Sequence, residues 1–213
     1  MEEAIQVFIY VHAASGGIAL IAGLVSMIAR KGKRTHRKSG LIFFYSMTFS
    51  GITAMLISLL PNHKSPFLFA IGIFSLYFVI TGKRALNFKK QNPNTFIDKG
   101  ISLFMTLTGF AMIVLPIIFT RSIDVILAVF GIVGIAFSIR DLMLFKNPFR
   151  LQNAWLKLHL GKMIGGFISA TTAFVVVGNY FPGIYGWFIP GIAGSFIIVY
   201  WTRKVSLKTA PNG

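Results

Sequence analysis

Residues 101–120 read ISLFMTLTGFAMIVLPIIFT, twenty consecutive residues without a charged side chain. The hydrocarbon core of a bilayer is about 30 Å thick, and roughly 20 apolar residues cross it as a helix. Pro116 lies inside the stretch, and a proline is tolerated in a transmembrane helix when neighbouring helices satisfy the carbonyl that it frees. The stretch is therefore predicted to be a transmembrane helix.

Six further stretches of the 213-residue chain have the same character. The seven predicted spans are 4–29, 40–60, 67–82, 101–120, 123–142, 158–181 and 184–202. The first is not expected to be a cleaved signal peptide, because Glu2 and Glu3 precede it and its apolar run is too long. The loops between the spans are short. We therefore predict an all-α, polytopic membrane helix bundle of seven transmembrane helices, in which residues 1–213 form one integral membrane domain.

The composition supports a membrane protein over a soluble one. Apolar residues make up 55% of the chain and charged residues 12%, whereas soluble domains carry about 25% charged residues. A disordered chain would need the opposite balance. Because the chain has no cysteine, a disulfide framework and a thiolate metal site are both excluded.

The basic residues predict the orientation of the bundle. Of the 21 Lys and Arg, 19 fall in alternate loops and the C-terminal tail, and only Lys64 and Arg121 fall on the opposite side. Positive charge is retained on the cytoplasmic face. This predicts an external amino terminus, a cytoplasmic carboxyl terminus, and residence in the cytoplasmic (inner) membrane of a bacterial cell.

The same distribution indicates which partners to expect. The net charge of +16 is split over short loops at a membrane surface, which argues against nucleic acid and favours anionic lipid headgroups as the counter-charge. The densest cluster, residues 30–38, is either a topological anchor or a contact for an anionic ligand. An oligomer is compatible with the sequence.

Polar side chains inside the spans are candidates for ligand binding, because burying them in a bilayer is costly. His12 lies in the first span, and hydroxyl residues recur at helical spacing in the second and sixth spans. His12 is either a hydrogen-bonded core residue, a ligand to a metal or haem, or a group that relays protons. If the two hydroxyl faces meet, they line a crevice between the second and sixth spans. The predicted ligand-binding residues are His12, Ser46, Ser50, Lys162 and Ser169.

A second group of polar residues is predicted near the cytoplasmic ends of the spans. If those ends converge, His36, Asp141 and His159 offer two imidazoles and a carboxylate to a divalent metal. The alternative is a salt-bridged lock, in which Asp141 is neutralised by Arg37, Arg140 or Lys162. His36 and His159 also form a candidate haem pair, whereas His12 and His63 differ in depth.

Three functions follow from these residues. The first, which we favour, is a transporter or binder of a small solute, an ion or a lipid. The second is a redox protein that holds haem or a metal, and the third is a membrane-embedded metal-dependent hydrolase. The cofactor is left open between haem, a divalent metal and none, and whether the chain is an enzyme also stays open. Phosphate-binding loops, dinucleotide fingerprints and paired carboxylates are absent from the sequence.

Three stretches carry a resemblance to a known family. They are HAASGGIALIAGLVSMIARKGKRTHRKSG (12–40), RDLMLF (140–145) and WLKLHLGKMIGGFISATTAF (155–174). They resemble segments of an uncharacterised prokaryotic family of multi-pass membrane proteins, which has no assigned activity. The resemblance implies that the positions most worth testing are His12, His36, Arg37, Gly40, Asp141, Trp155, His159 and Met163.

Overall fold

The computed structural model describes residues 2–209, and all of its regular elements in that range are helical. The helices are α1 (Glu2–Ile28), α2 (Arg34–Ile57), α3 (Pro66–Arg84), η1 (Ala85–Lys89), α4 (Phe96–Thr120), α5 (Val125–Leu144), α6 (Pro148–Val177) and α7 (Tyr185–Thr209). Each predicted span overlaps one α-helix. Several helices extend beyond their spans, because the polar turns at their ends need no apolar surroundings.

Short polar side chains fix where three of these helices begin. The side chains of Ser65, Asp124 and Asn147 accept hydrogen bonds from the backbone N–H three residues later, at 3.0–3.1 Å. Each bond satisfies an N–H that has no partner within its helix. Pro66 and Pro148 follow two of these caps, where a missing N–H costs nothing.

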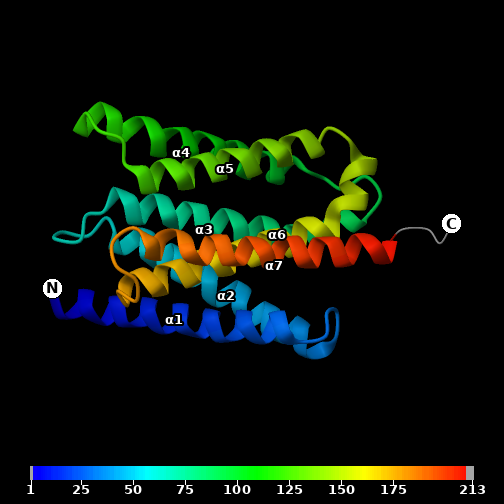
Figure 1. Ribbon diagram of the computed structural model, residues 1–213, viewed down its shortest axis with the longest axis horizontal. Coiled ribbons are helices and arrows are strands. Elements are labelled where there is room, and N and C mark those ends of the chain that lie inside the picture. Colours follow the sequence, from blue (N-terminus) through cyan, green and yellow to red (C-terminus); the bar gives the residue numbers. More distant parts are fainter. Residues whose placement is uncertain (1, 210–213) are drawn as a thin grey trace.

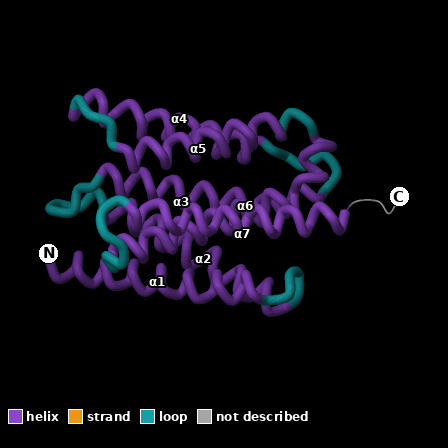
Figure 2. Tube along the Cα trace, in the orientation of Figure 1, coloured by secondary structure: helices purple, strands orange, loops and turns teal. Residues whose placement is uncertain are grey.

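Successive helices run in opposite directions, so the loops gather at the two ends of the bundle (Figures 1 and 2). One end holds the α1–α2, α3–α4 and α5–α6 connections and the end of α7 (Figure 1). We call it the basic end, because its loops are the ones that carry the clustered Lys and Arg. The amino terminus and the other three connections lie at the opposite end (Figure 1).

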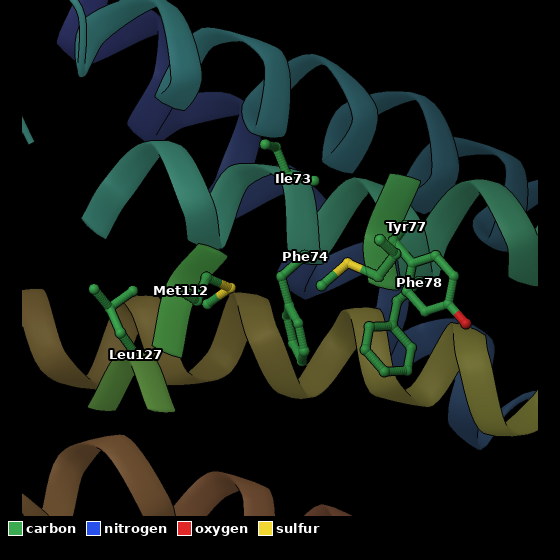
Figure 3. Close-up of a cluster of buried hydrophobic side chains, with 7 residues drawn as sticks. Ile73, Phe74, Tyr77, Phe78, Met112 and Leu127 are labelled. Atoms are coloured by element: carbon green, nitrogen blue, oxygen red, sulfur yellow. The ribbon is translucent and has the colours of Figure 1, made fainter. Parts of the chain in front are cut away.

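Helices α3 and α6 form the centre of the bundle. They pack against each other, α3 also contacts α2, α4 and α5, and α6 also contacts α1, α5 and α7. Aromatic residues of α3 pack against α4 and α5 in a buried cluster. Within α3, the rings of Phe74 and Phe78 pack edge-to-face, with 4.9 Å between their centroids. Tyr77 belongs to the same buried cluster, with its hydroxyl oxygen turned away from Phe74 (Figure 3).

Glycine allows α4 and α5 to approach closely. A Cβ atom at Gly131 would lie 2.7 Å from the carbonyl oxygen of Gly109, which is closer than two such atoms pack. Small residues at helix crossings are typical of membrane bundles, where association depends on close van der Waals packing.

Among the described residues, six helices, α1 to α6, are long and apolar enough to cross a membrane. Large apolar side chains also cover the outward faces, including Ile21, Phe119 and Phe196 at 69–78% exposure. Soluble monomers rarely expose continuous apolar surfaces of this kind. The structure is thus that of a chain compatible with an integral membrane protein. The seventh predicted span, α7, is not among these six.

A lysine at the basic end joins α1 to α7. Lys31 donates hydrogen bonds to the carbonyl oxygens of Ser26 and Met27, where α1 leaves carbonyls without helical partners. Its Nζ also lies 4.1 Å from the ring centroid of Trp201 on α7. Burial, with the nearby charge of Lys204, lowers the pKa of Lys31. The contact holds the end of α7 beside the end of α1.

Candidate functional site

A buried ion pair joins α5 to α6. Asp141 and Lys162 pair through the Oδ2 and Nζ atoms, and the two residues are only 2% and 3% exposed. Removing two charges from water is costly, and only good geometry with further hydrogen bonds compensates for it. The pair is the salt-bridged alternative of the sequence prediction, with Lys162 as the partner of Asp141.

Tyr77 of α3 completes the network. Its hydroxyl donates to Oδ2 of Asp141 at 2.7 Å and accepts from Nζ of Lys162 at 2.9 Å. Ser102 of α4 adds a longer contact to the same carboxylate oxygen, at 3.5 Å. One buried network therefore connects α3, α4, α5 and α6.

Glycine places Lys162 at this position. A Cβ atom at Gly82 of α3 would lie 3.1 Å from Cβ of Lys162 and 3.0 Å from Sδ of Met163. The bare backbone of Gly82 thus lets α6 approach α3 closely at the level of the ion pair.

The ion pair forms part of the wall of a cavity between α5, α6 and α7. The cavity has a volume of about 390 Å³, which lies within the range of small-molecule sites. Its lining residues are Phe137, Arg140 and Asp141 of α5, Lys157, Leu158, Gly161 and Lys162 of α6, and Ile198, Val199, Thr202 and Arg203 of α7.

The cavity is strongly positive. Arg140, Lys157 and Arg203 are exposed and join the buried Lys162 around it, whereas Asp141 is the one carboxylate among the described lining residues. Because Asp141 is already paired with Lys162, three cations remain without a carboxylate in the cavity. A cleft lined by one sign of charge concentrates ligands of the opposite sign.

A second cavity, of about 320 Å³, lies between α2, α3 and α4. It is lined by Met55, Ile73, Leu76, Tyr77, Ile80, Gly100, Ile101, Phe104 and Met105. Its only polar side chain among the described lining residues is Tyr77, so it offers no charge to a ligand.

A separate ion pair at the basic end was not predicted from the sequence. Arg84 donates from Nε and Nη2 to the two carboxylate oxygens of Asp98, both at 2.8 Å. Asp98 is 1% exposed. The bidentate pair links the end of α3 to the start of α4.

The predicted crevice between the second and sixth spans is wrong, because the two hydroxyl faces have different partners. His12 Nδ1 of α1 lies 3.0 Å from both the carbonyl oxygen of Ser50 and the hydroxyl of Thr53 on α2. Ser169 of α6 instead pairs with Ser75 of α3, at 2.5 Å between hydroxyl oxygens.

Helices α2 and α6 meet through apolar side chains instead. Phe43 of α2 and Phe167 of α6 pack with ring centroids 6.3 Å apart. Ser46 is half-buried on α2, one turn from Ser50. Of the predicted ligand-binding residues, His12 and Ser50 meet, and Lys162 lines the charged cavity.

The three predicted metal ligands, His36, Asp141 and His159, are not brought together as a set. Among the described residues, no three His, Asp or Glu side chains are placed to hold one metal ion. Asp141 pairs instead with Lys162. Sequence spacing alone could not decide whether Asp141 would bind a metal or pair with a cation. The two histidines are close enough to interact electrostatically.

The imidazoles of His36 and His159 each form a hydrogen bond with a backbone carbonyl oxygen. His36 Nδ1 lies 2.9 Å from the carbonyl oxygen of Ser26, and His159 Nδ1 lies 2.8 Å from that of Gly82. A carbonyl only accepts, so Nδ1 carries the proton in each ring and Nε2 of a neutral ring keeps its lone pair.

Comparisons of the chain with protein-family models, with curated proteins and with solved structures find no match. The site is therefore interpreted from its own geometry.

Proposed function

We propose that the chain is a bacterial inner-membrane protein of seven spans, with α7 as the seventh and the basic end in the cytoplasm. Six helices of sufficient length and apolarity support this, as do the apolar outward faces. The loops that carry the clustered Lys and Arg in the sequence lie at one end of the bundle (Figure 1), and retention of positive charge sets the orientation.

Within that membrane, the protein is a binder or transporter of a small anionic solute or lipid. The observation that carries this function is the charge of the cavity between α5, α6 and α7, where three cations have no carboxylate of their own. The buried Asp141–Lys162 pair makes the deep wall of the same cavity. The other cavity offers no comparable attraction, because its lining is apolar apart from Tyr77.

Thermal unfolding in a non-ionic detergent tests anion binding. Phosphate is titrated against chloride at constant ionic strength, and a site that binds phosphate raises the melting temperature as it saturates. A ligand at 100 times its Kd stabilises by about 2.7 kcal/mol. The cavity variant carries Arg140→Gln, Lys157→Gln and Arg203→Gln.

The matched control removes two arginines and one lysine that are exposed outside the cavity, through Arg34→Gln, Lys146→Gln and Arg150→Gln. We expect wild type and control to be stabilised by phosphate, and the cavity variant not to be. An equal response of both variants, or none in wild type, would overturn the proposal.

A metal or haem site is a second candidate function, favoured by the imidazoles of His36 and His159. Both donate Nδ1–H to a backbone carbonyl, which is the outer hydrogen bond that metal-binding histidines commonly make. Nε2 of each ring would be the metal ligand. Elemental analysis and the visible spectrum of the purified protein test this. A haem band or bound metal that is lost in His159→Ala supports it, and a colourless, metal-free preparation after growth with both supplied refutes it.

A further inference from the structure

The walls of the charged cavity differ along its depth. Arg140, Lys157 and Arg203 are exposed, whereas Gly161 and Ile198 lie about one helical turn further along α6 and α7 from the basic end. The cations thus line the outer part of the cavity. Beyond them, Gly161 and Ile198 form an apolar part of the wall, beside the buried Asp141–Lys162 pair.

The cavity is also open at its side. Helix α7 packs against α6, and α5 packs against α4, but α5 and α7 are not a packed pair among the described helices. Val199, on the α7 wall, is 45% exposed. In a bilayer, the surface of α7 next to this wall faces lipid, so a ligand can enter between α5 and α7 from within the membrane.

The size of the cavity limits what it can hold. Its volume of about 390 Å³ lies near the lower end of the range of about 300–1,000 Å³ for small-molecule sites. That space accommodates an anionic group and part of one hydrocarbon chain. Two chains of a diacyl lipid would need an additional groove.

Building on the proposed function, we propose that the ligand of this cavity is a single-chain anionic lipid that enters laterally between α5 and α7. Its phosphate or carboxylate contacts Arg140, Lys157 and Arg203 at headgroup level. Its chain lies along Gly161 and Ile198. Basic pockets between transmembrane helices on the cytoplasmic side are suited to anionic headgroups.

Gly161 offers a substitution that fills the apolar part and leaves the cations in place. A Cβ atom there would meet only Cγ2 of Ile198, at 3.9 Å, which is ordinary contact. Gly161→Ala therefore keeps the cavity, and it should stabilise α6 because alanine is the better helix former. Gly161→Leu places a branched side chain in the space assigned to the lipid chain.

The experiment compares three probes by thermal unfolding of the whole protein in a non-ionic detergent. They are 1-oleoyl lysophosphatidate, inorganic phosphate without a chain, and 1-oleoyl lysophosphatidylcholine with the same chain and no net charge. For wild type we expect lysophosphatidate to be half-saturating at a concentration at least tenfold below that of phosphate. Lysophosphatidylcholine should have no saturable effect.

Gly161→Leu separates a lipid from a free anion as the ligand. We expect it to raise the half-saturating concentration of lysophosphatidate at least tenfold while phosphate acts as in Gly161→Ala. If phosphate binds but lysophosphatidate binds no more tightly, or equally in the Leu and Ala variants, the lipid proposal is overturned and anion binding stands. If neither probe binds, both proposals fail.

Discussion

Breaking the Asp141–Lys162 ion pair from one side should destabilise the bundle more than removing both charges together. Lys162→Met leaves a carboxylate in a site where the side chains are 3–4% exposed, and Asp141→Leu leaves an ammonium group there. An uncompensated buried charge costs about 3–5 kcal/mol. Each remaining charge keeps one hydrogen bond with Tyr77. Asp141→Leu should cost the more of the two, because its ammonium group is left near the cations Arg140, Lys157 and Arg203, which attract the carboxylate left by Lys162→Met.

The double variant, Asp141→Leu with Lys162→Met, removes both charges, and the adjoining cavity gives the leucine room. The Tyr77 hydroxyl then loses both the group to which it donates and the group from which it accepts. An unsatisfied buried hydroxyl costs about 1–3 kcal/mol, which is the residual destabilisation expected. Adding Tyr77→Phe to the double variant should recover part of it, whereas the same change in wild type should destabilise.

Equilibrium unfolding of purified protein in mixed micelles measures these differences as a double-mutant cycle. We expect the double variant to be destabilised by at least about 3 kcal/mol less than the sum of the destabilisations of the two single variants. Each single change leaves an unpaired charge, whereas the double change leaves none. Additive single effects would show that the two charges do not depend on each other, and would refute the reasoning.

Three further predictions concern the packing of the bundle and use the same unfolding assay. Asp98→Asn should destabilise the protein by about 1–3 kcal/mol, because Arg84 loses a bidentate carboxylate with both contacts at 2.8 Å. An unchanged stability would show that this ion pair does not stabilise the bundle. Gly131→Ala should destabilise the protein by about 1–3 kcal/mol, because the new Cβ would lie 2.7 Å from the carbonyl oxygen of Gly109 on the facing helix. Gly100→Ala, whose Cβ would have nothing within 4 Å, should be neutral or stabilising. A larger loss of stability in Gly100→Ala than in Gly131→Ala would contradict the packing. His12→Ala should cost about 0.5–1.5 kcal/mol by removing its contacts at 3.0 Å to α2, and a stabilised variant would argue against a packing role.

The helices were predictable from sequence because apolar length is a direct requirement of the bilayer. The 20-residue run at 101–120 lies within α4, and the alternation of basic loops matches the arrangement of the two ends of the bundle. Residues 34–39 of α2 and 148–157 of α6 were left out of the spans, because the polar residues among them weaken the hydropathy signal.

The site was harder to predict because its parts come from four helices. Asp141 and Lys162 stood out as ionisable residues near apolar spans, but which cation would pair with Asp141 depends on the packing of α5 against α6. Tyr77 was missed, although a single tyrosine inside an apolar span is a usable signal: a buried phenol needs a partner.

The error about the crevice has a physical cause as well. The spacing of Ser50 and Ser169 within each helix shows that hydroxyls share a face. It does not show which neighbour that face meets. Here Ser50 faces His12 of α1 and Ser169 faces Ser75 of α3, so the rotation of each helix in the bundle decides the outcome.

The proposed anion site requires a bundle that crosses the bilayer with its basic end inside the cell, and labelling of single cysteines tests this most directly. The chain has no cysteine of its own, so Ser122→Cys in the α4–α5 loop and Gln91→Cys in the α3–α4 loop each introduce one exposed thiol. With a membrane-impermeant maleimide, we predict labelling of Ser122→Cys in intact cells and labelling of Gln91→Cys only after permeabilisation. Labelling of Gln91→Cys in intact cells, with Ser122→Cys protected, would contradict the orientation and the cytoplasmic placement of the anion site.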